Sequence, residues 1–162
     1  MKSKSSEPSS PERARLYALR LLAARDYTVA RIKEKLRSRE FAESDLGEAV
    51  SRLEEEGWIS DRRFAERFAD AALVSGRYVG PRLKLEMRRR GLPDDLVSDV
   101  IARLSEEYDE CREVRAVLER RFPGFSYAVA SDKDKRRILG FLQRRGFGFS
   151  AIMRAMKAED RC

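Results

Sequence analysis

A short pattern that occurs three times along the chain limits its fold more than any other feature. The segments are LRSREF at 36–41, MRRRGL at 87–92 and LQRRGF at 142–147. In the last two, arginines precede a glycine and an apolar residue follows it. Glycine readily adopts the left-handed conformation that ends an α-helix, and the next apolar residue can pack back onto the last turn. The pattern therefore predicts helices that end alike, while Glu40 in the glycine position leaves the first of these ends undefined.

Apolar positions before these segments extend the repeat. Two inner positions of the middle helix recur at spacings of 51 and 55 residues: Ile32, Leu83 and Ile138 at the first, and Leu36, Met87 and Leu142 at the second. A unit of about fifty residues buries a core poorly alone and is stabilised by its neighbours. We therefore predict an all-α protein: a flexible polar tail and three three-helix modules in an elongated array, with boundaries 1–13, 14–59, 60–107 and 108–162.

Apolar periodicity and capping residues predict the individual helices. Thr28, Ser60 and Ser131 precede helical stripes as N-caps, and Gly57 ends the third stripe. The first helix is expected to bury Leu16, Leu19 and Ala23, and the third to bury Leu46, Ala49, Val50 and Leu53.

Several classes of function are disfavoured by what the sequence lacks. Histidine is absent, which removes Ser-His and Cys-His catalysis and histidine-metal sites. The two cysteines have no metal-ligand spacing, and Cys111 on an apolar stripe is expected to be a buried thiol. We find no glycine-rich phosphate loop, no signal peptide and no apolar run of about 18 residues. The expectation is a cytoplasmic protein without cofactor or metal.

Basic residues exceed acidic ones, which suggests a polyanionic partner. The net charge is +7, and residues 109–162 carry 13 basic against 8 acidic side chains. Since successive helical residues lie about 100° apart, these cations must spread over exposed faces. The candidate contacts to a partner or DNA are Arg82, Lys84, Arg88, Arg89, Arg90, Arg136, Arg137, Arg144 and Arg145. The alternative is a solvated face on which Glu86 pairs with Arg82 or Arg90.

Two aromatic residues allow either packing or stacking on a nucleobase. Trp58 follows Gly57, which favours a hydrophobic contact across a helix end. Tyr78 lies in the loop SGRYVGP at 75–81, where packing is favoured over base stacking.

Three longer motifs follow one another in a fixed order: GWISDRRFAERFA at 57–69, GPRLKLEMRRRGL at 80–92 and ILGFLQRRGF at 138–147. This series resembles the RecX family, regulators of the bacterial recombinase RecA, and the likeness extends from Ala14 to Ala158. Glu40 departs from it. Within the motifs, the residues with an expected structural role are Gly57, Trp58, Asp61, Phe64, Ala65, Gly80, Gly91, Gly146 and Phe147.

The resemblance implies three tandem three-helix modules in a curved rod. Proteins of this family bind in the helical groove of RecA filaments on single-stranded DNA, and some also contact DNA directly. They restrain ATP hydrolysis, strand exchange and filament growth, and they are not enzymes. The resemblance thus implies a regulator of DNA recombination, repair and the SOS response that takes no small-molecule substrate and binds no membrane. The same surfaces would serve a protein that assists the filament.

A helical module that acts through nucleic acid alone is the main alternative, supported by the basic third module. A metal-dependent nuclease or transferase is a weaker one, because the carboxylates have no recognisable ligand spacing.

Overall fold

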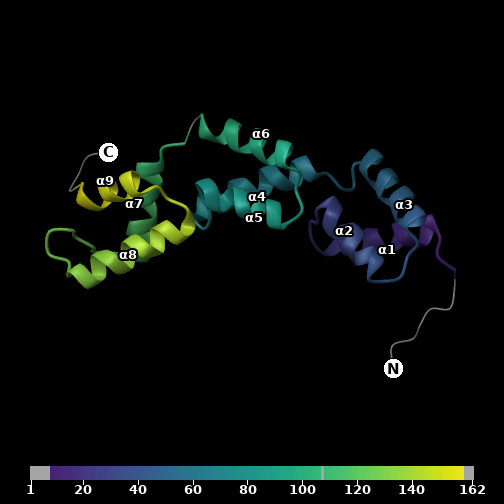
Figure 1. The fold of residues 1–162 in the computed structure, drawn as a ribbon, viewed down its shortest axis with the longest axis horizontal. Helices are drawn as coiled ribbons and strands as arrows, with labels where there is room; N and C mark the ends of the chain where they lie inside the picture. The colour runs from purple at the N-terminus through teal and green to yellow at the C-terminus, as the bar shows by residue number, and fades with distance from the viewer. Residues whose placement is uncertain (1–7, 107, 159–162) are drawn as a thin grey trace, which may run out of the picture. The chain divides into compact units, whose positions relative to one another are not determined.

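The part of the chain that the structure describes is built from helices alone. The computed structural model describes residues 8–106 and 108–158. These ranges contain nine helices and no strand (Figure 1), with the bounds α1 Pro11–Ala24, α2 Val29–Arg37, α3 Glu43–Glu55, α4 Asp61–Ser75, α5 Gly80–Arg89, α6 Asp94–Ser105, α7 Glu110–Arg121, α8 Asp132–Arg145 and α9 Phe149–Lys157. The predicted all-α class is confirmed.

The helices form two compact units. Unit 1 consists of Met1–Ala65 with Arg90–Leu92, and unit 2 consists of Glu66–Arg89 with Pro93–Cys162. Neither unit is one continuous segment, and α4 begins in unit 1 and ends in unit 2. The finer division into three modules stays a prediction.

Unit 1 packs α1, α2 and α3 around one apolar core. The predicted inner faces of α2 and α3 are confirmed, because their buried residues are Ile32, Leu36, Leu46, Ala49, Val50 and Leu53. The predicted face of α1 is wrong in part. Leu19 packs against this core as predicted, but Leu16 is 47% exposed, and Ala14 and Ala18 are the completely buried residues of the helix. A face of alanines lets α1 approach α3 closely, and the larger leucines then lie outside the tightest contact.

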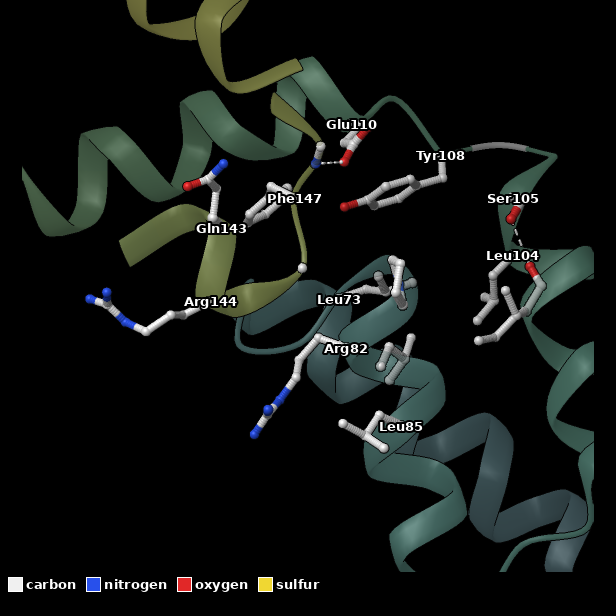
Figure 2. Close-up of a pocket in the computed structure, with 16 residues that line it drawn as sticks. Leu73, Arg82, Leu85, Leu104, Ser105, Tyr108, Glu110, Gln143, Arg144 and Phe147 are labelled. Carbon is white, nitrogen blue, oxygen red and sulfur yellow. Dashed lines mark hydrogen bonds between the residues drawn. The ribbon is translucent and has the colours of Figure 1, made fainter. Parts of the chain in front are cut away.

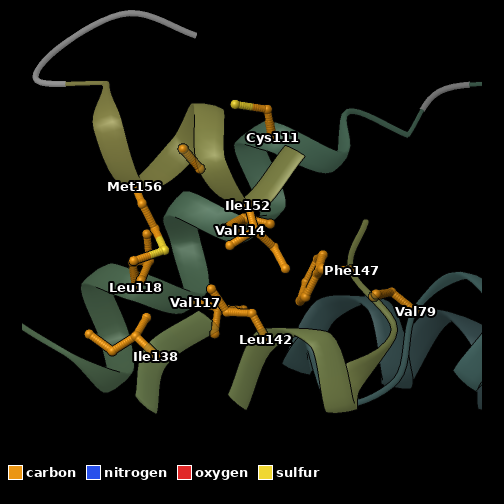
Figure 3. Packing of buried hydrophobic residues seen from close by; sticks show 11 residues of the cluster. Val79, Cys111, Val114, Val117, Leu118, Ile138, Leu142, Phe147, Ile152 and Met156 are labelled. Carbon is orange, nitrogen blue, oxygen red and sulfur yellow. The ribbon is translucent and has the colours of Figure 1, made fainter. Parts of the chain in front are cut away.

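Unit 2 has its main core between α7, α8 and α9 (Figure 3). Ile138 and Leu142 of α8 are buried there, together with Phe147 and the loop residue Val79. The expected burial of Cys111 in this core is confirmed, but its sulfur is disulfide-bonded, so the prediction of a thiol is wrong. Leu83 and Met87 of α5 are also buried, as the repeat predicts.

The C-terminal end of α8 has the predicted geometry. Gly146 adopts φ +103°, and its N–H donates to the carbonyl O of Gln143 at 3.0 Å. Phe147 N–H donates to the O of Leu142 at 3.3 Å, and its ring is buried. These two hydrogen bonds satisfy carbonyls that the helix leaves without a partner and form a Schellman motif.

The variant segment ends α2 in the same way although it lacks the glycine. Glu40 adopts φ +63°, and its N–H donates to the O of Arg37 at 2.8 Å. Phe41 N–H donates to the O of Leu36 at 3.3 Å. The tertiary structure therefore imposes a left-handed conformation that a glutamate adopts at a cost in free energy.

Replacing this residue should stabilise the protein. We expect Glu40→Gly to raise the free energy of unfolding by about 1 kcal/mol, because glycine has no Cβ that opposes a positive φ. The measurement is urea denaturation followed by circular dichroism. Glu48→Gly, in the regular helix α3, is the control and should lower stability by about 1 kcal/mol. A loss of stability in both variants would contradict the conformation assigned to Glu40.

The start of α2 is held by residues that lie far from it in the sequence. Thr28 caps the helix by accepting from Arg31 N–H at 3.3 Å, and its buried hydroxyl donates to the O of Arg90 at 2.6 Å. Asp61 Oδ1 accepts from Val29 N–H at 2.9 Å. Burial raises the pKa of the Asp61 carboxyl, while the hydrogen bond from Val29 opposes that change.

The geometry around Gly91 explains why the second repeated segment, at 87–92, has a glycine at this position. Its φ is +82°, and a Cβ there would lie 2.5 Å from the Cβ of Ala30. Gly91 therefore lets the backbone after α5 approach α2 within unit 1.

Candidate functional site

The end of α8 meets the start of α5 within unit 2. Val79 N–H donates to the carbonyl O of Arg145 at 2.8 Å. A Cβ on Gly146 would lie 2.0 Å from the O of Val79, and a Cβ on Gly80 would lie 3.1 Å from the O of Gly146. Two glycines that the sequence marks separately thus permit one close backbone contact. This contact brings the arginine-rich helices α5 and α8 to the same part of unit 2.

A cavity of about 1030 Å³ lies beside this contact (Figure 2), lined mainly by apolar side chains such as Leu73 and Phe147. Arg82 from α5 and Arg144 from α8 both line it, and Figure 2 shows their guanidinium groups directed away from its centre. The Tyr108 hydroxyl is buried and has no hydrogen-bond partner among the described residues. Burial raises the pKa of this phenol, so it stays protonated at neutral pH. The site suits non-covalent binding at a basic rim.

The cations of α5 are largely neutralised by carboxylates. Glu86 is only 6% exposed, and its Oε1 lies 2.7 Å from Arg82 Nη2 and 3.2 Å from Arg89 Nη1. Arg88 Nε lies 2.5 Å from Asp94 Oδ1. The Glu86–Arg82 pair that the sequence allows is therefore formed, and Lys84 is partly buried. These pairs reduce the charge that α5 presents to a partner.

The cations of α8 differ among themselves. Arg137 Nη2 lies 3.4 Å from Asp134 Oδ1, and its guanidinium carbon lies 5.9 Å from the centre of the Phe122 ring. Arg136 is exposed and donates from Nε to the O of Asp132 at 3.2 Å. Arg136 and the exposed Arg144 form no ion pair with a carboxylate in the described parts of the chain.

Arg145 has a structural role in addition to its charge. Its Nη1 donates to the O of Gly76 at 2.7 Å, and its guanidinium carbon lies 4.3 Å from the centre of the Phe141 ring. Burial lowers the pKa of the Arg145 guanidinium, and the charges of Arg121, Arg120 and Arg77 lower it further.

Arg90 belongs to unit 1, whereas the other candidates belong to unit 2. Its backbone carbonyl accepts from Thr28, and Arg90 lines a smaller cavity with Tyr27, Phe64 and the cations Arg25, Arg31 and Lys35. Neither unit therefore contains all nine of the predicted residues. Their role in binding stays a prediction.

The aromatic candidates have different environments. The Trp58 side chain is 56% exposed, so the predicted packing contact is incomplete. The backbone N–H of Trp58 donates to the O of Leu53 at 2.9 Å and helps to end α3. Tyr78 stacks on Phe68 with ring centres 6.2 Å apart. The guanidinium carbons of Arg77 and Arg82 lie 5.4 and 5.8 Å from its centre. The favoured packing of Tyr78 is thus confirmed.

The sequence interpretation missed three arginines that surround Arg145. Arg77 follows α4, and Arg120 and Arg121 end α7. A signal existed for two of them, because LERRF at 118–122 follows the same order of an apolar residue, two arginines and an apolar residue, without the glycine.

Residues 8–106 and 108–158 contain neither a candidate metal site nor a candidate membrane span. No group of three or more Cys, Asp or Glu side chains there is placed to hold a metal ion. None of the helices in those ranges has the length and apolar character needed to cross a membrane.

Known families and proteins match this chain closely. The model of the first three-helix domain of RecX matches residues 14–53, and that of the third matches residues 107–156. Regulatory protein RecX of Trichlorobacter lovleyi is 42% identical over 139 residues, covering 86% of this chain and 90% of the relative. Its counterpart in Syntrophotalea carbinolica is 35% identical over 144 residues, with coverages of 89% and 94%.

A solved structure has the same fold. The crystal structure of RecX from Lactobacillus salivarius superposes with a TM-score of 0.71 at 20% identity, covering 90% of this chain and 93% of the other. With the two domain matches, this likeness confirms the predicted tandem array of helical domains.

Proposed function

Since this chain belongs to the RecX family of regulatory proteins, we propose that it regulates the RecA recombinase. It binds in the groove of RecA filaments on single-stranded DNA and inhibits ATP hydrolysis, strand exchange and filament growth. It acts in the cytoplasm, during recombination and repair, as a binding protein rather than an enzyme.

The observation that carries this proposal is the recurrence of one basic helix end on a tandem array. The helices α2, α5 and α8 carry cations in their last turns, and each is followed by a residue with a positive φ. A filament groove repeats along its axis, so recurring surfaces on one chain can contact more than one protomer and gain affinity through effective concentration. The basic side chains complement acidic surfaces and DNA phosphates.

The test is DNA-dependent ATP hydrolysis by preformed RecA filaments. The protein is added below one copy per recombinase, with negligible free DNA. Inhibition at these ratios supports the proposal. A regulator that binds the filament acts on RecA protomers already assembled on DNA, whereas a protein that binds only DNA would have to compete for the DNA. An unchanged rate, together with tight binding to naked DNA, would instead favour the module that acts through nucleic acid alone.

Arg136 and Arg144 are the best residues for a double variant that tests the proposed contact. Both are exposed without an ion pair in the described structure, whereas Arg145 also holds the Gly76 carbonyl. We expect R136A/R144A to raise the half-inhibitory concentration roughly 5- to 10-fold, because two exposed attractions to the filament are lost. The control R52A/R103A removes the same charge from arginines paired with Glu48 and Glu66. Equal effects of the two double variants would argue against this contact surface.

Nucleic-acid binding without a recombinase remains the second candidate function, favoured by the arginines that form no ion pair. For that module, DNA affinity should account for any effect on ATP hydrolysis. The effect should vanish on filaments that leave no DNA exposed.

A further inference from the structure

Four arginines come together in unit 2 where three helices end. Arg77 immediately follows the turn after α4, Arg120 and Arg121 are the last residues of α7, and Arg145 is the last residue of α8. Only Arg145 belongs to the basic segments that recur in the sequence. The other three become neighbours of Arg145 through the packing of α4, α7 and α8.

Hydrogen bonds hold two of the guanidinium groups on the same helix end. Arg145 Nη1 donates to the O of Gly76 at 2.7 Å, and Arg120 Nη1 donates to the O of Val74 at 3.2 Å. Arg120 Nε also donates to the O of Ala116 at 3.2 Å. Val74 and Gly76 lie at the C-terminal end of α4, where free carbonyls and the helix dipole favour positive charge. The fold therefore fixes these cations without using a carboxylate.

Aromatic rings contact two of the four arginines. The Phe141 ring centre lies 4.3 Å from the guanidinium carbon of Arg145, and the Tyr78 ring centre lies 5.4 Å from that of Arg77. Contacts of this kind stabilise a cation and restrict its orientations. The orientations of Arg145, Arg120 and Arg77 are thus restricted before a ligand binds.

The four cations repel one another. The pKa of the Arg145 guanidinium is lowered by burial and by the charges of Arg121, Arg120 and Arg77. None of the four forms an ion pair with a carboxylate in the described parts of the chain. An anion that binds to such a cluster relieves this repulsion and lowers the free energy. The arginines of α5 are already paired and gain less stabilisation from an anion.

We propose that Arg77, Arg120, Arg121 and Arg145 form a binding site for the phosphodiester backbone of a nucleic acid. Arginine presents five N–H donors in a planar fork that matches phosphate oxygens. A nucleic-acid backbone carries one negative charge on each nucleotide and so supplies closely spaced anions to a fixed group of cations. A folded acidic surface carries carboxylates at positions set by its own helices and matches such a cluster less readily.

This site deepens the proposed function and rests on it only for its biological setting. It would place nucleic acid at the helix ends of unit 2, leaving Arg136 and Arg144 for the recombinase. The residues differ in the two assignments, so one can fail while the other stands.

The experiment measures the fluorescence anisotropy of labelled single-stranded and double-stranded oligonucleotides titrated with the full chain across a salt series. The test variant is R77A/R121A, because neither side chain donates a hydrogen bond that supports the fold in the described structure. R52A/R103A is the control of equal net charge. Thermal melting checks that both variants fold like the parent.

We expect R77A/R121A to weaken DNA binding at least tenfold and to reduce the salt slope by about 1.4 for a single strand, as loss of two phosphate contacts requires. The control should bind like the parent. A loss on one of the two DNA forms identifies that form as the source of the phosphates, and weak competition by polyglutamate supports phosphate over carboxylate recognition.

Equal weakening in both double variants would overturn the proposal, because binding would then follow net charge alone. Unchanged DNA binding with lost inhibition of RecA would also overturn it and assign the cluster to an acidic protein surface. Inhibition by the parent chain tests the proposed function independently of either result.

Discussion

Gly146→Ala should lower the free energy of unfolding by about 3 kcal/mol or more, combining an unfavourable positive φ with steric overlap. The residue has φ +103°, and the added Cβ would lie 2.0 Å from the carbonyl O of Val79 and 2.8 Å from the Cβ of Arg82. A backbone carbonyl that already belongs to the contact between α8 and α5 cannot move aside without breaking that contact. The expected readout is a large fall in the midpoint of urea denaturation.

Gly57→Ala is the matched control for this prediction. Gly57 also ends a helix, with φ +75°, but nothing lies within 4 Å of an added Cβ. Only the conformational cost applies, so we expect a loss of about 1 kcal/mol. Equal losses at the two positions would mean that Gly146 does not approach Val79 in solution.

Leu36→Ala should cost roughly 2–5 kcal/mol, the range for truncating a fully buried leucine. Leu36 is the last apolar residue of α2 and is completely buried in the core of unit 1. The truncation removes apolar contacts and leaves a cavity that the surrounding helices close only in part. Circular dichroism during urea denaturation measures the change.

The same substitution at Leu16 tests the corrected face of α1. Leu16→Ala removes identical atoms from a side chain that is 47% exposed, and alanine has the higher helix propensity. We expect a change within about 0.5 kcal/mol, as for other surface substitutions. A loss comparable to that of Leu36→Ala would restore the face predicted from the sequence.

The repeat made the fold predictable from the sequence to a large extent. The residues at its two inner positions are all buried, including Ile32, Met87 and Leu142. The periodicity worked because α2, α5 and α8 bury apolar residues at the same two positions. It failed at Leu16 of α1 because hydrophobicity ranks leucine above alanine, whereas the closest helix contacts favour the smaller Ala14 and Ala18.

The candidate site was less predictable because charge in a sequence does not show which cations are paired. Arg88 is the second residue of its repeated segment, and Arg144 is the third residue of its own. Arg88 nevertheless pairs with Asp94, whereas Arg144 forms no ion pair in the described residues. The cluster around Arg145 combines α4, α7 and α8, so only tertiary structure reveals it. Local conformation is limited in the same way, because the sequence does not predict that Glu40 adopts a left-handed conformation.

The interleaved composition of unit 1 has a consequence for the order in which the protein is made. Thr28 finds its acceptor on Arg90, which is synthesised only after the 24 residues Glu66–Arg89 of unit 2. At translation rates of about 5–20 residues per second, that interval lasts roughly 1–5 s. During this interval the Thr28 hydroxyl at the start of α2 lacks its native acceptor. Unit 1 is completed only when Arg90–Leu92 have been synthesised.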